Sequence, residues 1–308
     1  MGGHFTTEEG HMRAFNAIKA SIAGATLALG TAAVALAQDA GKQFGPEVNG
    51  WFLQESATPV MDDLVKVHNL VQIIITGIVI LVFGLLAYIM IRFRESKNPV
   101  PSKTSHNTLI EVIWTVVPVI LLVIIAIPSM NLLYKQDRLP ETELTVKAVG
   151  GTWNWAYSYP DFETDEYVSN PLDETQAQAV GQPYLLATDA PLVVPVNTKV
   201  KVLVTSVNNM HSWAVPSFGV KMDAVPGIIN ETWFEVREEG TFYGQCSEIC
   251  GIRHYYMPIE VRVVSQPEFA RYIADGGIPA EKPALAALRE APKTIELAGT
   301  PSATQANR

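Results

Sequence analysis

Five residues of this chain could together bind soft metal ions, and four of them share one short stretch. Cys246, Cys250, His254 and Met257 follow one another at intervals of three or four residues. The fifth, His211, lies 35 residues before Cys246. Because one turn of backbone can direct side chains at this spacing toward a common point, the stretch from Cys246 to Met257 predicts a metal site.

The ligand types leave three interpretations of this stretch open. Two cysteines and two histidines suit one tetrahedral zinc ion. A blue copper ion takes one cysteine, two histidines and a weak methionine ligand, and the additional thiolate here could bridge two copper ions. His211 and His254 would then serve one ion each, with Met257 as the weak ligand of one and a backbone carbonyl as that of the other. The third interpretation is a disulfide between Cys246 and Cys250.

Two apolar segments earlier in the chain are long enough to cross a membrane. Residues 69–91 and 112–134 each form a run of 23 residues without a charged side chain, and about 20 apolar residues are enough for a span. We predict transmembrane helices over residues 67–91 and 108–134. The connecting loop, residues 92–107, carries four basic side chains and one acidic side chain. The positive-inside rule therefore places this loop in the cytoplasm and both flanking segments outside it.

The N-terminal region has the pattern of a secretory signal peptide. A basic start precedes an apolar, alanine-rich core at residues 22–36, and Ala35-Leu36-Ala37 is a small-x-small cleavage site. We predict a signal peptide over residues 1–37, with an uncleaved membrane anchor as the alternative. The polar segment 38–66 is then external to the membrane.

The sequence changes character after the second apolar segment. Short stretches rich in β-branched and aromatic residues alternate with proline, glycine and asparagine turns. In residues 198–206 lysines alternate with valines, which is the period of a half-buried strand. We predict a small β-sandwich or barrel over residues 140–265, of about the size expected for such a domain. After it, residues 266–308 are predicted to form a short helix and a loose tail.

Composition and charge exclude some classes of partner. Charged residues make up only 17% of the chain and the mean hydropathy is +0.16, as expected for a membrane protein. A net charge of −9 argues against a nucleic-acid partner. Residues 149–197 contain no lysine or arginine, and such an acidic run is either a solvated face or a surface that steers a basic partner. Its acidic residues are Asp161, Glu163, Asp165, Glu166, Asp173, Glu174 and Asp189.

Several motifs together resemble the CuA-containing subunit II of bacterial-type haem-copper cytochrome c oxidases. The resemblance runs in order through roughly residues 50–270. It implies a membrane-anchored α+β fold, in which a two-helix transmembrane hairpin is followed by a cupredoxin-like Greek-key β-barrel in the periplasm. The motifs that carry it are Glu111–Thr115, Trp153–Tyr157, His211–Ser217, Asp223–Gly227, and Gly244–Gly251 with His254 and Met257.

The resemblance also implies a set of ligands. A dinuclear copper centre would be bound by His211, Cys246, the carbonyl of Glu248, Cys250, His254 and Met257. The Glu248 carboxylate would bind a magnesium or manganese ion shared with subunit I, and Asp223 would belong to the polar network of the same interface. An exposed loop carboxylate and a turn-forming aspartate are the simpler alternatives for Glu248 and Asp223.

Two further residues gain a role only from the resemblance. Trp153 would be the surface aromatic residue where an electron enters from cytochrome c, although Trp153 and Trp155 also fit a role as core or interface aromatics. Glu111 would lie at the cytoplasmic mouth of a proton path in the partner subunit. Glu111 also completes a capping-box pattern that begins at Thr108.

The expected function follows from this family. The chain would accept electrons from cytochrome c at the copper pair and pass them to haem in subunit I, where oxygen is reduced to water and protons are pumped. We expect the bacterial inner membrane as its location, and subunit I, subunit III, cytochrome c and membrane lipid as partners. A membrane-anchored copper or zinc binding protein and a quinol-oxidase-type subunit II are the alternatives. No Cys-x-x-Cys-His sequence is present, which disfavours a covalently attached haem.

Overall fold

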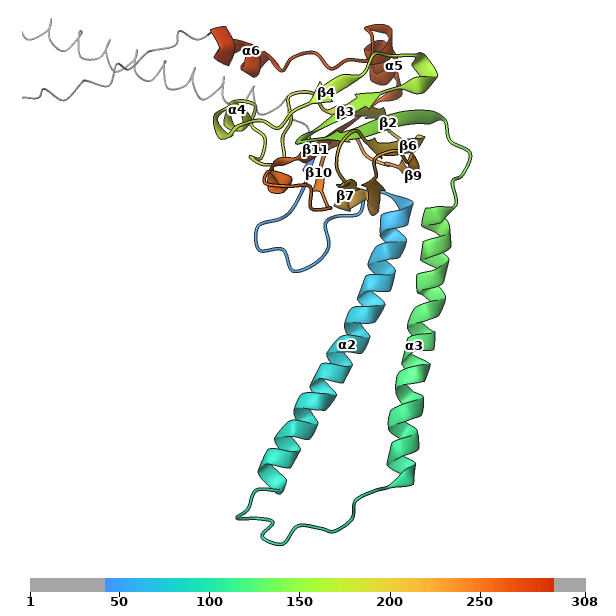
Figure 1. The fold of residues 1–308 in the computed structure, drawn as a ribbon, viewed down its shortest axis with the longest axis vertical. Coiled ribbons are helices and arrows are strands. Elements are labelled where there is room, and N and C mark those ends of the chain that lie inside the picture. Colours follow the sequence, from blue (N-terminus) through green and yellow to red (C-terminus); the bar gives the residue numbers. More distant parts are fainter. Residues whose placement is uncertain (1–41, 291–308) are drawn as a thin grey trace, which may run out of the picture.

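The computed structural model describes residues 42–290. Two long helices lie side by side below a β domain (Figure 1). The predicted signal peptide, residues 1–37, and the last part of the predicted tail, residues 291–308, lie outside the described residues.

Helices α2 (Pro59–Arg92) and α3 (Thr108–Asp137) contain the two predicted spans. Each begins after a residue whose side chain accepts hydrogen bonds from free N–H groups of the first turn, Thr58 for α2 and Asn107 for α3. The most apolar window of each helix has a mean hydropathy of 2.8, and none of it is buried inside the protein. Apolar helices of this length are expected to face lipid or a membrane-embedded partner. This confirms the predicted two-helix hairpin.

Two ion pairs join the external end of the hairpin to itself and to the β domain. Lys135 of α3 contacts Asp63 of α2, with 2.5 Å between Nζ and Oδ2. Asp62, the preceding residue of α2, pairs with Arg237 of the β domain at 2.8 Å. These contacts hold the β domain against the helix ends, so the hairpin sets where the domain lies relative to the membrane.

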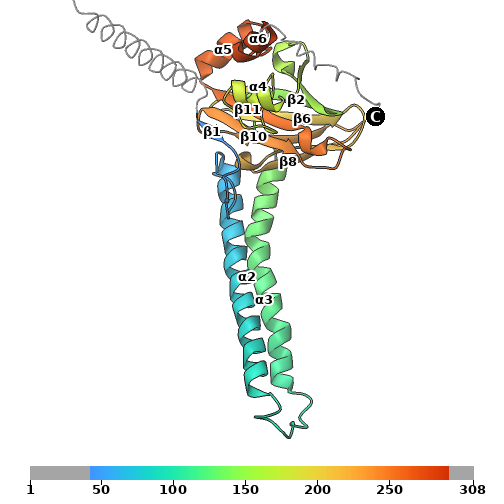
Figure 2. The ribbon, with the colours of Figure 1, turned by 90° about the vertical axis from the view of Figure 1, so that its left-hand side faces the viewer.

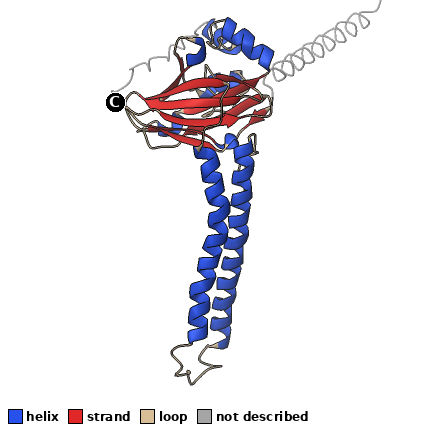
Figure 3. Ribbon diagram, turned by 90° about the vertical axis from the view of Figure 1, so that its right-hand side faces the viewer, coloured by secondary structure: helices blue, strands red, loops and turns tan. Residues whose placement is uncertain are grey.

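The β domain is a sandwich of two sheets (Figure 3). Its strands are β1 (Gln43–Phe44), β2 (Leu144–Gly151), β3 (Asn154–Ser158), β4 (Tyr167–Ser169), β5 (Leu192–Pro195), β6 (Lys199–Ser206), β7 (His211–Val215), β8 (Val220–Ala224), β9 (Asn230–Glu235), β10 (Gly240–Cys246) and β11 (Pro258–Val264). One sheet has the order β4-β3-β2-β6-β9, and the other has the order β5-β11-β10-β7-β8 with β1 beside β10. Strands β2 and β6 pair in parallel, as do β5 and β11, so long connections carry the chain between paired strands.

Aromatic side chains fill the space between the two sheets. Trp155, Tyr157, Trp213, Phe234 and Phe242 are all buried there. In β6, burial alternates along the strand, with the valines inside and the lysines half-buried. The predicted period of two is thus confirmed, and the two inner faces together form one core.

The C-terminal segment is folded further than its composition suggested. Helices α5 (Gln266–Ala274) and α6 (Pro283–Glu290) lie on the side of the β domain opposite the hairpin (Figure 2). Leu285 of α6 is buried in a small apolar cluster with Leu172 and with Ala177 of α4 (Glu174–Ala179). Within residues 266–308, where we predict one short helix and a loose tail, the structure thus has a second helix that ends at Glu290.

Candidate metal centre

Two neighbouring strands bring the distant ligands together. His211 begins β7 and Cys246 ends β10, and these strands pair so that Cys246 lies opposite Trp213. The loop after Cys246 returns to the sheet through a short helical turn, η3 (His254–Tyr256). The N–H of Cys246 donates to the carbonyl of Met257 at 3.0 Å, which closes the loop over the end of the sandwich.

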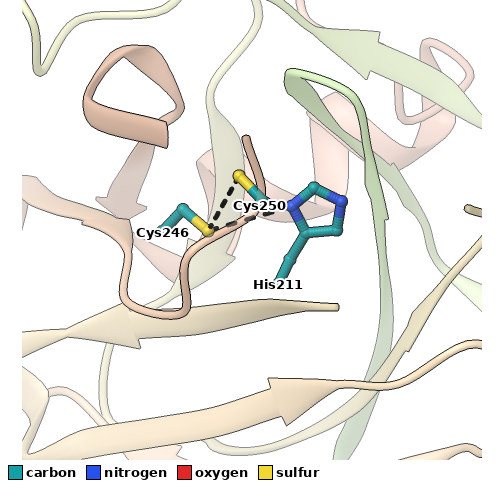
Figure 4. A group of neighbouring side chains, drawn as sticks. All are labelled: His211, Cys246 and Cys250. Carbon is teal, nitrogen blue, oxygen red and sulfur yellow. Dashed lines mark hydrogen bonds between the residues drawn. The ribbon is translucent and has the colours of Figure 1, made fainter. Parts of the chain in front are cut away.

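The two thiols lie next to each other, beside the imidazole of His211 (Figure 4), and His254 follows on the far side of Cys250. The Sγ of Cys246 is 3.8 Å from Nδ1 of His211 and 3.8 Å from Sγ of Cys250. The Sγ of Cys250 is in turn 3.7 Å from Nδ1 of His254. The four donor atoms therefore form a chain in which each sulfur is next to one nitrogen and to the other sulfur.

Two weaker donors complete this group. The backbone carbonyl of Glu248 lies 3.3 Å from Sγ of Cys246. Met257 is fully buried and belongs to the same core cluster as both cysteines. The Glu248 carbonyl therefore lies beside the donor chain, and Met257 is a buried thioether in the same core.

Burial favours the neutral forms of the Cys250 thiol and the His211 imidazole in the absence of a metal ion. Burial, together with the neighbouring Cys246 thiol, raises the pKa of the Cys250 thiol to about 12. Burial lowers the pKa of His211, and the nearby His254 lowers it further. Binding of a metal ion must therefore displace thiol protons, which is the usual coupling between metal affinity and pH.

The geometry disfavours two of the three occupants considered. A disulfide needs about 2.05 Å between its sulfurs, whereas Cys246 and Cys250 are free thiols 3.8 Å apart. The four ligands of one zinc ion lie at most 2.3 Å from it, so no two donors are more than about 4.6 Å apart. The group whose donors all lie within 4.8 Å of one another comprises His211, Cys246 and Cys250, without His254. The four donor atoms, with His254 included, therefore extend over a greater distance than the ligands of one tetrahedral ion.

Known proteins match this chain along most of its length. The family model for the periplasmic domain of cytochrome c oxidase subunit II matches residues 144–264, and the model for the transmembrane domain of that subunit matches residues 46–132. The chain is 40% identical over 285 residues to cytochrome c oxidase subunit 2 of Cereibacter sphaeroides, covering 86% of this chain and 94% of that protein. The chain belongs to the cytochrome c oxidase subunit II family.

A second relative agrees with this assignment. A probable cytochrome c oxidase subunit 2 of Rickettsia prowazekii is 48% identical over 233 residues, which are 75% of this chain and 74% of that protein. The crystal structure of the periplasmic domain of subunit II (CoxB) of Bradyrhizobium japonicum is 45% identical, covers 46% of this chain and 97% of that chain, and has a TM-score of 0.43.

Family membership confirms several expectations. The chain is a subunit of an oxidoreductase complex, cytochrome c oxidase, and this membership implies subunit I as a partner. It is anchored in the membrane by its hairpin and carries its β domain in the periplasm. The predicted fold class, a transmembrane hairpin followed by a cupredoxin-like barrel, is confirmed as well.

Trp153 lies against the cysteine loop, and it is less buried than Trp155. Trp155 is fully buried in the core, whereas Trp153 is half-buried in the turn between β2 and β3. The guanidinium of Arg253 lies 5.7 Å from the centre of the Trp153 ring. Trp153 thus lies between the cysteine loop and the protein surface.

The other residues that were predicted to be functional lie in two regions, one near the candidate metal centre and one at the far end of α3. Glu248 is half-buried within the cysteine loop, and Asp223 of β8 pairs with Ser212, the residue after His211. Glu111 lies in the first turn of α3, at the other end of a helix about 45 Å long. The cap of this helix is Asn107, so the predicted capping box from Thr108 is wrong.

The acidic run of this subunit II is divided between two ends of the β domain. Asp161 and Asp165 follow β3, which separates them from Trp153 by roughly 17 Å. Glu174 begins α4, and α4 is held near the metal loop because the Tyr256 hydroxyl donates to the carbonyl of Leu172 at 2.9 Å. Only the second part of the run lies beside the candidate metal centre.

Sequence reasoning missed two residues that hold the ring of His211 in this subunit II. A Cβ at Gly150 would lie 2.9 Å from Cδ2 of His211, so only glycine leaves room for the ring. Trp155 meets the same ring edge-on, with 6.1 Å between the ring centres. Two glycines at the end of a strand, as in β2, indicate a close approach of another group, but the sequence gives no sign of which group approaches.

Proposed function

We propose that this chain is the electron-accepting subunit of its oxidase and that a dinuclear copper centre occupies the site at His211 and the cysteine loop. The observation that carries the proposal is the donor chain His211–Cys246–Cys250–His254, with spacings of 3.8, 3.8 and 3.7 Å. Two cysteine sulfurs between two imidazoles would hold a pair of copper ions. They do not match a single tetrahedral ion, because His254 lies outside the compact group.

The residues present fit such a pair by type as well as by spacing. Soft thiolate and thioether sulfurs favour copper over the hard cations, and Met257 supplies the thioether. The Glu248 carbonyl, 3.3 Å from Sγ of Cys246, would supply a weak oxygen donor. A bound copper pair would supply reversible one-electron transfer.

The protein surrounding these ligands contributes rigidity. Cys246, Cys250, His211 and Met257 are all buried, and the loop is closed by the hydrogen bond between Cys246 and Met257. Ligands held by packing change position little when the charge of a site changes, so little energy is needed for reorganisation. This favours a redox relay over a carrier that must release its metal, such as a metallochaperone.

The other functional residues are proposed on the same basis. Trp153 would receive the electron from cytochrome c, because its ring lies between the surface and the loop. Glu248 would bind a magnesium or manganese ion shared with subunit I, with Asp223 in the polar network beside it. Glu111 would lie at the mouth of a proton path at the cytoplasmic end. Electrons would pass to haem in subunit I for reduction of oxygen to water coupled to proton pumping, and subunit III would be a further partner.

The proposal also includes the boundaries and the locations of several segments. The periplasmic copper domain would comprise residues 140–265, and residues 92–107 would form the cytoplasmic loop. Residues 1–37 would be removed as a signal peptide, which leaves residues 38–66 outside the membrane. A quinol-oxidase-type subunit is disfavoured, because such a subunit lacks the copper ligands that are all present here.

Electron paramagnetic resonance of the copper-loaded full-length chain tests the proposal. An unpaired electron shared by two copper nuclei gives more hyperfine lines than an electron on one nucleus. We expect the shared pattern for the native chain and its loss in Cys246→Ser. Tyr255→Phe, an exposed change in the same loop, should leave the pattern unchanged. A single-copper pattern in the native chain, or no copper uptake, would overturn the proposal.

A further inference from the structure

We infer that Asn208 is a positioning residue that fixes the tautomer and orientation of His211, and that it joins this ligand to the turn that carries Trp153. The inference rests on the proposed function, in which His211 is a copper ligand. Asn208 lies in the loop between β6 and β7, three residues before His211. Neither composition nor spacing identified it as part of the site.

The first contact is between the amide of Asn208 and the outer nitrogen of His211. The Oδ1 of Asn208 is 3.2 Å from Nε2 of His211. The backbone N–H of Asn209 donates to the same oxygen at 2.7 Å. A backbone N–H can only donate, so the atom that it contacts is the carbonyl oxygen of the amide and not its nitrogen. The orientation of the Asn208 amide is therefore fixed by the backbone.

The tautomer of His211 follows from this orientation. An imidazole nitrogen that faces a carbonyl oxygen makes a hydrogen bond only if it carries the proton. Nε2 is thus the protonated nitrogen, and Nδ1 keeps its lone pair. Nδ1 is the nitrogen that faces the thiols, 3.8 Å from Sγ of Cys246. The ring is therefore prepared to bind a metal ion before the ion arrives.

Other neighbours hold the ring but do not determine its proton. Gly150 and Trp155 contact the ring through carbon atoms, and they limit its tilt. Among residues 42–290, Asn208 and Cys246 are the ones with a side-chain polar atom in contact with a His211 ring nitrogen. Asn208 is the one on the side away from the thiols, so the choice of tautomer depends on it.

The second contact extends the same amide to the turn between β2 and β3. The Nδ2 of Asn208 donates to Oγ1 of Thr152, the residue before Trp153. The next residue, Asn209, donates from its own Nδ2 to the carbonyl of Cys250 at 3.3 Å. This pair of asparagines thus connects three segments: the Trp153 turn, the His211 strand and the cysteine loop. A displacement of Trp153 is opposed by the same amide that orients the ligand.

Two substitutions at position 208 separate the role of the oxygen from that of the amide nitrogen. Asn208→Leu has nearly the same shape but offers no acceptor. Asn208→Asp keeps an acceptor for both His211 and Asn209, and the Thr152 hydroxyl can then donate to its second oxygen. Val207→Asp is the matched control, because Val207 is 72% exposed. Its replacement by aspartate adds the same charge one residue away.

The experiment uses the full-length chain in detergent and begins without metal. Nitrogen-15 NMR of labelled histidines reports the tautomer of His211, which is assigned with a His211→Gln variant. We expect the Nε2-protonated form in the native chain, in Asn208→Asp and in Val207→Asp, and a mixture of tautomers in Asn208→Leu. A native His211 protonated at Nδ1, or a native-like spectrum in Asn208→Leu, would overturn the inference.

Copper titration of the same variants gives the second readout. Loss of a partner that orients a ligand typically lowers metal affinity 10- to 100-fold, and we expect a loss of about this size in Asn208→Leu. Asn208→Asp should retain the native affinity and rescue the fold if Asn208→Leu is unstable. It should also lower the reduction potential more than Val207→Asp does, since a carboxylate makes the imidazole more basic. If the native chain binds no copper pair, the proposed function fails, whereas the tautomer measurement still decides the role of Asn208. Equal affinities for the native chain and Asn208→Leu would contradict that role.

Discussion

The ring of Trp153 packs against the backbone of Gly251. This glycine belongs to the cysteine loop, where it follows Cys250 and precedes His254. A Cβ at Gly251 would lie 3.5 Å from Nε1 and Cζ2 of Trp153, and the φ angle of Gly251 is +122°. This φ is one that a side chain rarely tolerates. The glycine therefore permits both the turn of the loop and the close approach of the indole.

Replacement of Trp153 tests whether this contact is the path of the electron. We expect Trp153→Ala to lower the rate at which reduced cytochrome c transfers an electron to the intact oxidase, by about 10- to 100-fold, because the aromatic contact to the loop is lost. Stopped-flow absorbance at the copper and haem bands measures this rate. Trp51→Ala, a change of an almost fully exposed tryptophan, is the control. An unchanged rate in Trp153→Ala, with the copper spectrum intact, would assign the electron path to another residue.

Gly150 provides a test of how tightly His211 is held. A methyl group at position 150 would lie 2.9 Å from the His211 ring, so Gly150→Ala must displace the ring or strain the strand. Overpacking of this kind costs about 1–3 kcal/mol. We expect a lower midpoint of thermal unfolding and weaker copper binding. Gly84→Ala meets no atom within 4 Å and should change neither, whereas native-like copper binding in Gly150→Ala would show that the ring can move without loss.

Local patterns explain why much of this site could be predicted from the sequence. Four of the five side chains proposed as ligands lie within one loop, so their spacing alone predicted convergence. The alternation of lysine and valine in β6 reflects burial of every second side chain, which a single strand reveals. The hairpin followed from two uncharged runs, because the membrane imposes a length that is visible in the sequence.

Contacts between distant segments explain what could not be predicted. Gly150 and His211 belong to different sheets, and they meet only because the sandwich closes over the end of β2. Strand β1 pairs with Thr241 and Phe242, almost two hundred residues away. The division of the acidic run depends on the direction of β3, and amino-acid composition gives no information about that direction. In each case the decisive quantity is the packing of one element against another.

The division of the acidic run predicts unequal effects of two charge reversals. Glu174 lies beside the metal loop and Asp165 lies beyond β3, and both are exposed. We expect Glu174→Lys to raise the KM of the oxidase for a basic cytochrome c several-fold at low salt, since charges at the rim of a docking surface act mainly on association. Asp165→Lys should have a smaller effect. Both effects should diminish at high ionic strength, and equal effects of the two variants would contradict the position assigned to the docking surface.

The buried ion pair between Lys282 and Glu260 gives a prediction for the stability of the C-terminal segment. The Nζ of Lys282 lies 3.0 and 3.1 Å from the two carboxylate oxygens of Glu260. Glu260 also accepts hydrogen bonds from Gln182 and from the backbone N–H of Thr188, each at 2.7 Å. Lys282→Met leaves this carboxylate buried without a counter-charge, which costs about 3–5 kcal/mol. The double variant Lys282→Met, Glu260→Gln should recover part of the loss.

The same pair predicts how stability changes with pH. Burial lowers the pKa of Lys282 from its ordinary value of 10.5, although the Glu260 carboxylate opposes this shift. Between the lowered pKa and pH 10.5 the unfolded chain binds more protons than the folded chain, so the contribution of Lys282 to the free energy of unfolding rises with pH. Denaturant unfolding of the β domain in the full-length chain, followed by near-ultraviolet circular dichroism at increasing alkaline pH, measures this slope. We expect the native chain to show a more positive slope than Lys282→Met in that window. Equal slopes would mean that burial does not disfavour the lysine cation, and that the pair holds α6 against the β domain without a cost in charge desolvation.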